Sequence, residues 1–142
     1  MKLDELQSMA EKDLKIDDLE LGDESIKNAA LHQKYLTIYN NYRHLVLQKK
    51  AEYNVLYRKK WEYYSGKADP QVYRDNPFDH KILKQDLPIY LDSDEDLIKA
   101  SGLVEHYKIC ADTCERTLKQ IQNRGWDIKN AIEWRKFVDG AI

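Results

Sequence analysis

The sequence predicts an all-α fold in which two helices form a long hairpin, with short helices at the N-terminal and C-terminal ends. Two observations carry this prediction. No Gly or Pro occurs from Ser25 to Tyr64, and all three prolines lie between residues 67 and 96. Apolar side chains on both sides of that proline-containing segment recur at steps of three and four residues, which is the helical period. A chain of 142 residues is long enough for one ordinary domain.

The first element expected is a short amphipathic helix over Leu3–Leu14. Its apolar positions, at helical spacing, are Leu3, Leu6, Met9 or Ala10, and Leu14. Residues 15–22 are expected to be extended or to form a turn that ends at Gly22-Asp23. Asp23 is then a plausible N-cap for the next helix.

The long helix is predicted from about Ser25 to Tyr64. About 40 residues at a rise of about 1.5 Å give a helix on the order of 60 Å long. Such a helix needs a partner along its apolar stripe, from the same chain or from another subunit. Gly66 suits the left-handed position that ends a helix. The stripe consists of Leu31, Tyr35, Ile38, Tyr42, Leu45 with Val46, Tyr53, Leu56 and Tyr64.

Residues 67–96 are expected to form a long loop, with a short strand around Leu87–Leu91. A loop of this length is expected to pack on another part of the protein or to move. The acidic residues of Ser93–Asp96 then suit the positive N-terminal end of the return helix.

The return helix is predicted to end at Arg124-Gly125, with Gly125 as its cap and Arg124 beside its negative end. Trp126–Val138 is expected to be a separate, short, aromatic helix that serves docking or assembly. We therefore divide the chain at residue 125, into a helical domain of residues 1–125 and a C-terminal helix within residues 126–142. One face of that last helix carries Ala131, Trp134 and Val138.

The net charge of −2 points to no particular partner, but the charges are unevenly distributed. Residues 2–24 contain nine acidic and three basic side chains, whereas residues 43–67 contain seven basic and two acidic ones. Aromatic residues are mainly Tyr (10) and Trp (3), which suit interfaces and stacking surfaces as well as cores. A neutral chain with one basic block can still bind a polyanion at that block.

The N-terminus lacks an apolar signal core, and no apolar run is long enough to span a membrane, so no membrane contact is expected. The two cysteines do not suggest a disulfide framework, which favours a reducing cytosol.

Enzymatic motifs are missing from the sequence. Ser65-Gly66-Lys67 lacks the spacing and the following Ser or Thr of a phosphate-binding loop. His106, Cys110 and Cys114 share one helical face and would be three ligands of a metal site, but no fourth ligand is evident. Small apolar positions in the helix stripe are the better interpretation of both cysteines. We predict a protein that is not an enzyme and that needs no cofactor and no metal.

The informative stretch is Tyr53–Lys67, where cations and aromatic rings alternate. Lys and Arg neutralise phosphates and release counterions, and aromatic rings stack on unpaired bases of any sequence. Basic residues at a helix C-terminus also complement its dipole, and Tyr53, Leu56 and Tyr64 suit a core position. The DNA-binding residues predicted from this stretch and its flank are Arg58, Lys59, Lys60, Tyr57, Trp61, Lys67 and Lys50.

Three segments resemble the UvsY family of recombination mediators from T-even-type bacteriophages. They are Met1–Gln7, the block Arg58–Lys67 with its Tyr-Tyr-Ser-Gly run, and Asn123–Lys129. The resemblance spans essentially the whole chain. The central basic pair of the family corresponds here to Arg58 and Lys60, with Lys59 inserted where the family can have a small neutral residue.

The resemblance implies a mediator that binds single-stranded DNA in the host cytoplasm, with residues 1–125 as the single-strand DNA-binding helical domain and residues 126–142 as the oligomerisation helix. It would help a RecA-like phage recombinase to load onto strand that is coated by the phage single-strand-binding protein. It also implies a closed, ring-like homo-oligomer, a hexamer or heptamer, assembled through helical segments that include the C-terminal one. A structural helical adaptor that binds an acidic protein through the basic block is the alternative hypothesis.

Overall fold

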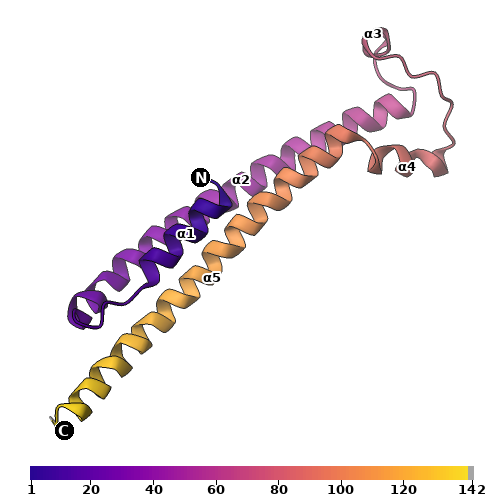
Figure 1. Ribbon diagram of the computed structural model, residues 1–142. Helices are drawn as coiled ribbons and strands as arrows, with labels where there is room; N and C mark the ends of the chain where they lie inside the picture. Colours follow the sequence, from indigo (N-terminus) through magenta and orange to yellow (C-terminus); the bar gives the residue numbers. More distant parts are fainter. Residues whose placement is uncertain (141–142) are drawn as a thin grey trace. The chain divides into compact units, whose positions relative to one another are not determined.

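The computed structural model describes residues 1–140, and its secondary structure over that range is entirely helical (Figure 1). The prediction of an all-α fold is therefore confirmed. The two longest helices, α2 and α5, have 44 residues each. The elements are α1 (Leu3–Leu14), α2 (Leu21–Tyr64), α3 (Pro70–Asp75), the 3-10 helix η1 (Lys84–Asp86), α4 (Leu87–Asp92) and α5 (Glu95–Val138).

The chain divides into two compact units. The terminal unit combines Met1–Arg43 with the chain from Lys108 onward, and the central unit is the continuous stretch His44–Tyr107. Both α2 and α5 contribute to each unit. Within each unit a stretch of α2 runs alongside a stretch of α5, as the predicted hairpin requires (Figure 1).

The core of the terminal unit forms where α1, α2 and α5 present their apolar faces. The hydroxyl of the fully buried Tyr35 donates a hydrogen bond of 2.8 Å to Asp13 Oδ2, and Lys34 Nζ lies 2.7 Å from the same oxygen, so α1 is fixed to α2. Both cysteines are fully buried, as expected for apolar positions of the stripe. The buried apolar residues are Leu6, Ala10, Leu21, Tyr35, Tyr42, Cys110, Ala111, Cys114, Ile121 and Ile128.

A buried ion pair connects the start of α2 to α5 inside this core. The Arg124 guanidinium pairs with the Glu24 carboxylate, and both side chains are more than nine-tenths buried. Arg124 also donates to the backbone carbonyls of Leu14, Lys15 and Glu24 and, at 2.8 Å, to Asn28 Oδ1. The prediction that Arg124 lies at the negative end of the return helix was wrong, because α5 continues to Val138. The guanidinium instead bonds to carbonyls at the C-terminal end of α1, Leu14 and Lys15.

Helix α5 runs unbroken through Gly125, so the predicted cap and the separate helix Trp126–Val138 were both wrong. A Cβ on Gly125 would lie 3.3 Å from Asn28 Nδ2. Asn28 is held at both ends of its amide, since Nδ2 donates to the Ile121 carbonyl at 2.9 Å and Oδ1 accepts from Arg124. Glycine is therefore needed here for the close approach of α2 to α5 within the terminal unit.

This geometry predicts opposite effects for two glycine substitutions in α5. Gly125→Val should lower the free energy of unfolding by about 1–3 kcal/mol, because overpacking pushes against an amide that cannot move. Gly102→Ala should raise it by about 0.5–1 kcal/mol, because a Cβ there meets nothing within 4 Å and alanine favours the helix. Urea unfolding followed by circular dichroism measures both changes. A stabilised Gly125→Val variant would contradict the packing argument.

Helix α2 begins at Leu21, four residues before the predicted start, and ends as predicted. Asp23 lies in the first turn and is not the N-cap, although its charge still suits the helix dipole. At the other end Gly66 has a φ of 78°. The amides of Gly66 and Lys67 bond to the carbonyls of Tyr63 and Glu62, which is the Schellman arrangement.

The segment after α2 is helical where a strand was expected around Leu87–Leu91. Pro88 stands in the first turn of α4, where its fixed φ is favourable and its missing N–H costs nothing. Leu87 and Leu91, one turn apart, are buried with Leu97 at the start of α5. The residues of α2 that pack against these three leucines are Tyr53, Leu56, Trp61 and Tyr64, which confirms the core role expected for three of them.

Candidate nucleic-acid interface

A groove of about 920 Å³ lies in the central unit, where α2 ends and the chain turns back. Four of the seven predicted DNA-binding residues line it, and all four are cations. The lining residues are Leu56, Arg58, Lys59, Lys60, Glu62, Tyr63, Tyr64, Lys67, Ala68, Asp69, Val72, Asn76 and Asp96.

The turn at Gly66 builds one side of this groove by returning the chain over α2. The Tyr73 hydroxyl donates to the Tyr63 carbonyl at 2.8 Å and accepts from the Ala68 amide at 3.3 Å. The Tyr63 hydroxyl in turn donates to the Asn76 carbonyl at 3.0 Å. These bonds fix α3 and the following residues against the last turn of α2, so the groove is preformed.

The cations of the groove differ in how far they are engaged. Lys59 is exposed and has no ion pair within residues 1–140. Arg58 is also exposed, with only a loose contact of 3.8 Å from Nε to Glu62 Oε1. Lys60 forms two ion pairs, since its Nζ lies 2.8 Å from Asp96 Oδ2 and 3.2 Å from Asp94 Oδ2.

Asp94 is the centre of a polar network at the start of α5. Its carboxylate accepts a 2.6 Å hydrogen bond from the Tyr64 hydroxyl and a 3.0 Å bond from the Leu97 amide, so it caps the helix as well as holding Lys60. Burial alone would raise the pKa of Asp94, but these donors outweigh it and lower the pKa below 3.8. For Lys60 the signs are opposite. Burial alone would lower the pKa of its ammonium, but the hydrogen bonds to Asp96 and Asp94 have the larger effect, so the pKa is raised. Both groups are charged at neutral pH.

The remaining predicted residues, Lys50, Tyr57 and Trp61, do not line the groove. Tyr57 is exposed and leans on Tyr53, with ring centroids 6.1 Å apart. Trp61 is partly buried against the leucines of the core, and Lys67 Nζ lies 4.8 Å from its ring centroid. Tyr57 and Trp61 therefore have different surroundings, although they lie one turn apart on α2.

Tyr63 is an aromatic groove residue that was not among the predicted DNA-binding residues. Its ring contacts those of Tyr64, Tyr73 and Phe78, at centroid distances of 5.1, 5.5 and 5.3 Å. Two of these partners lie in the segment that was expected to be a loop. The Tyr-Tyr pair alone was a weak signal, because only the folding of residues 73–78 back onto α2 gives Tyr63 its place.

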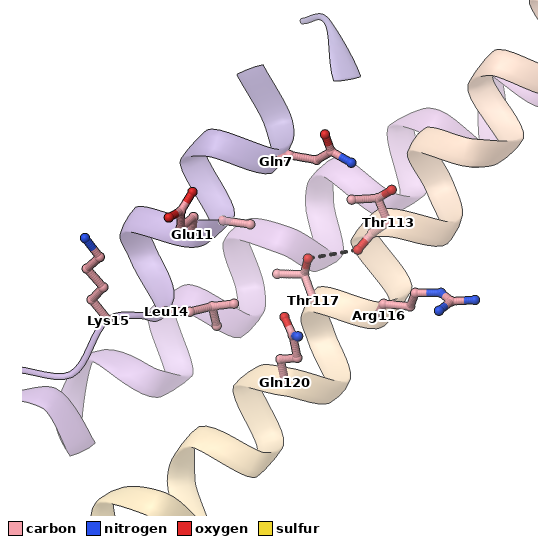
Figure 2. A pocket seen from close by; sticks show the side chains of 9 residues that line it. Gln7, Glu11, Leu14, Lys15, Thr113, Arg116, Thr117 and Gln120 are labelled. Carbon is pink, nitrogen blue, oxygen red and sulfur yellow. Dashed lines mark hydrogen bonds between the residues drawn. The ribbon is translucent and has the colours of Figure 1, made fainter. Parts of the chain in front are cut away.

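A second hollow lies in the terminal unit between α1 and α5, with a volume of about 610 Å³ (Figure 2). It contains none of the predicted site residues. Its only cations are Lys15 and Arg116, and it has no aromatic wall. The Thr117 hydroxyl on its floor donates to the Thr113 carbonyl at 2.8 Å. This hollow therefore lacks the combination of charge and rings that single-stranded nucleic acid requires.

An exposed apolar patch occupies the end of α5. The rings of Trp134 and Phe137 stack with centroids 5.6 Å apart, and about two-thirds of each residue is exposed. Val138 is also exposed, whereas Ala131 is partly covered. Phe137 extends the face that was predicted from Ala131, Trp134 and Val138.

Residues 1–140 contain no group of three His, Cys, Asp or Glu side chains placed to hold a metal ion. His106 instead contacts the ring of its neighbour Tyr107. Over the same described range, no helix is both long enough and apolar enough to cross a membrane.

Residues 9–141 match the protein family described as recombination, repair and ssDNA binding protein UvsY. The chain belongs to the UvsY family. It is 28% identical over 140 residues to recombination protein UvsY of Enterobacteria phage T4, with 99% of both chains covered. Two crystal structures of the bacteriophage T4 recombination mediator protein UvsY superpose on it with TM-scores of 0.87 and 0.84. Both are 28% identical to it, and the alignments cover 98% and 94% of this chain and 98% of each T4 chain.

Membership of the UvsY family establishes the general activity. The chain is a recombination mediator that binds single-stranded DNA in recombination and repair, and it belongs to a family that is not enzymatic. The basic groove at the end of α2 is therefore a candidate binding surface and not a candidate catalytic site.

Proposed function

We propose that the groove of the central unit is the surface on which this UvsY-family protein binds single-stranded DNA. The observation that carries the proposal is that Arg58, Lys59, Lys60 and Lys67 all line one preformed groove. Their charges neutralise the phosphates of the strand and release its counterions. Lys50 extends the basic surface along α2.

The unpaired bases of the strand stack on an exposed aromatic ring beside the groove. Tyr57 offers an exposed ring one turn from Lys60, and a ring of this kind stacks on any base. Trp61 has a different role in the proposal, because its contact with Lys67 holds that ammonium at the groove. The strand is thus bound mainly through phosphates, which makes binding independent of sequence.

The assembly that we propose is a closed homo-oligomer, a hexamer or heptamer, joined through the residues from Trp126 onward. The exposed rings of Trp134 and Phe137 support it, since apolar patches of this kind mark protein interfaces. One groove per subunit binds weakly, and a ring repeats it, so avidity increases the overall affinity.

The biological step that follows is the loading of a RecA-like phage recombinase in the host cytoplasm. Wrapping around the assembly would hold the strand in a shape that favours the recombinase and would loosen the single-strand-binding protein. The description of the T4 relatives as recombination proteins and mediators supports this step. Filament loading on coated strand tests it, because an assembly with Arg58→Ala and Lys60→Ala should load recombinase poorly.

Salt-dependent binding of a fluorescent oligo(dT) tests the groove itself. Single substitutions of Arg58, Lys59, Lys60 or Lys67 by Ala should each weaken binding and should make its salt dependence less steep by up to about 0.7 per lost phosphate contact. Lys119→Ala removes the same charge from an exposed position of α5 in the terminal unit and is the control. Groove variants that bind as the control does would place the DNA on a different surface.

A further inference from the structure

The groove carries nearly as many negative as positive side chains. Its four cations face three lining carboxylates, those of Glu62, Asp69 and Asp96. A surface whose only task was to bind a polyanion tightly would gain nothing from them, because like charges repel phosphate. At least one of these carboxylates should therefore oppose the binding of the strand at a particular cation.

That cation is Lys60. Its ammonium is shared by two carboxylates, Asp94 and Asp96, which differ in how far they are buried. The Asp94 side chain is about 5% exposed and is fixed by Tyr64 and by the Leu97 amide, so it is a structural partner that stays in place. The Asp96 side chain is about 68% exposed, and Lys60 is its only bonding partner among the described residues. An exposed pair of this kind is weak and is screened by salt.

The Asp96 carboxylate occupies a hydrogen-bonding position on Lys60 that a phosphate oxygen could take. It lies 2.8 Å from Lys60 Nζ, which is the ordinary distance of a charge-assisted hydrogen bond, and it lines the same groove as Lys59 and Arg58. The ammonium has three N–H donors, two of which face Asp94 and Asp96, so a phosphate oxygen that approaches Lys60 from the groove competes with the Asp96 charge beside it. Asp96 is free to leave, since it is exposed and lies in the first turn of α5 with no other bond to break.

We propose that Asp96 is an internal competitor for the DNA phosphate at Lys60 and that it limits the affinity of the groove for single-stranded DNA. A mediator that must pass its strand on benefits from this arrangement, because the carboxylate returns to Lys60 as the phosphate leaves. This inference rests on the proposed DNA-binding role of the groove.

The test is a comparison of Asp96→Asn with Glu95→Gln. Both substitutions remove one negative charge from the first turn of α5, and both positions are exposed, but only Asp96 bonds to Lys60. At low salt Asp96→Asn should bind oligo(dT) roughly two- to five-fold more tightly per subunit engaged, which corresponds to the strength of an exposed ion pair. Its salt dependence should also become steeper, since no carboxylate regains counterions when the phosphate binds. Glu95→Gln should give only the small change expected of a general charge effect.

Lys60→Gln completes the experiment and separates the two levels of the proposal. In a Lys60→Gln background the gain from Asp96→Asn should disappear. If Lys60→Gln binds single strand as the wild type does, Lys60 does not contact phosphate and the competitor role of Asp96 is overturned. If variants of Arg58, Lys59 and Lys67 also bind as the wild type does, the proposed function of the groove is wrong. If Lys60→Gln weakens binding but Asp96→Asn gains no more than Glu95→Gln, or gains equally without Lys60, the groove stands and the competitor role of Asp96 is overturned.

Discussion

Arg124→Met should lower the free energy of unfolding by about 3–5 kcal/mol, because it leaves the buried Glu24 carboxylate without its main partner. Lys27 remains 3.1 Å from Glu24 but is largely exposed and cannot replace a buried guanidinium. The carbonyls of Leu14, Lys15 and Glu24 also lose a donor. Guanidinium chloride unfolding at a fixed protein concentration measures the change.

Arg116→Met is the matched control for this substitution. Arg116 lies on the same helix and pairs with Asp112 at 2.9 Å, but its side chain is about 77% exposed, so its loss should cost no more than about 1 kcal/mol. The double variant Glu24→Gln with Arg124→Met should recover part of the loss, because no uncompensated charge stays buried. Equal effects of Arg124→Met and Arg116→Met would show that the buried pair contributes nothing special to the terminal unit.

Trp134→Ala combined with Phe137→Ala should dissociate the assembly that we propose. Rings that anchor an interface commonly cost about 2 kcal/mol or more each when truncated, and a closed ring repeats that loss at every subunit contact. Sedimentation should show a shift to small species. Circular dichroism should remain unchanged, since both rings are mostly exposed within the chain and support little of its core.

Leu47→Ala is the control for the aromatic pair, because Leu47 is an equally exposed large apolar residue of α2 outside the patch. It should keep the mass of the wild type. If the double variant keeps that mass as well, the C-terminal patch does not join the subunits. The avidity argument for the groove would then need another interface.

The sequence allowed the parts of the fold with local signals to be predicted. The apolar stripes gave the helices of the hairpin, Gly66 gave the end of α2, and the acidic residues before Leu97 gave the start of α5. Each of these signals acts within about one turn of the residue that carries it. For the same reason the cations of the groove could be named, since they lie close together on α2 and its terminal turn.

The features that could not be predicted depend on residues far apart in the chain. Glu24 and Arg124 are 100 residues apart, and nothing in either neighbourhood indicates a buried pair. Gly125 resembles a helix cap until Asn28 is seen beside it. Tyr63 became a groove residue only because Tyr73 and Phe78 fold back onto it. In each case a tertiary contact overrides a local preference.

The two units also differ in when they can be completed during synthesis. All residues of the central unit, His44–Tyr107, are consecutive, so they are present together before the last quarter of the chain is made. The terminal unit contains both chain ends, and its Arg124–Glu24 pair cannot form until translation has passed residue 124. The groove-bearing part of a subunit is thus available for folding first, and the part with the exposed aromatic patch is completed later.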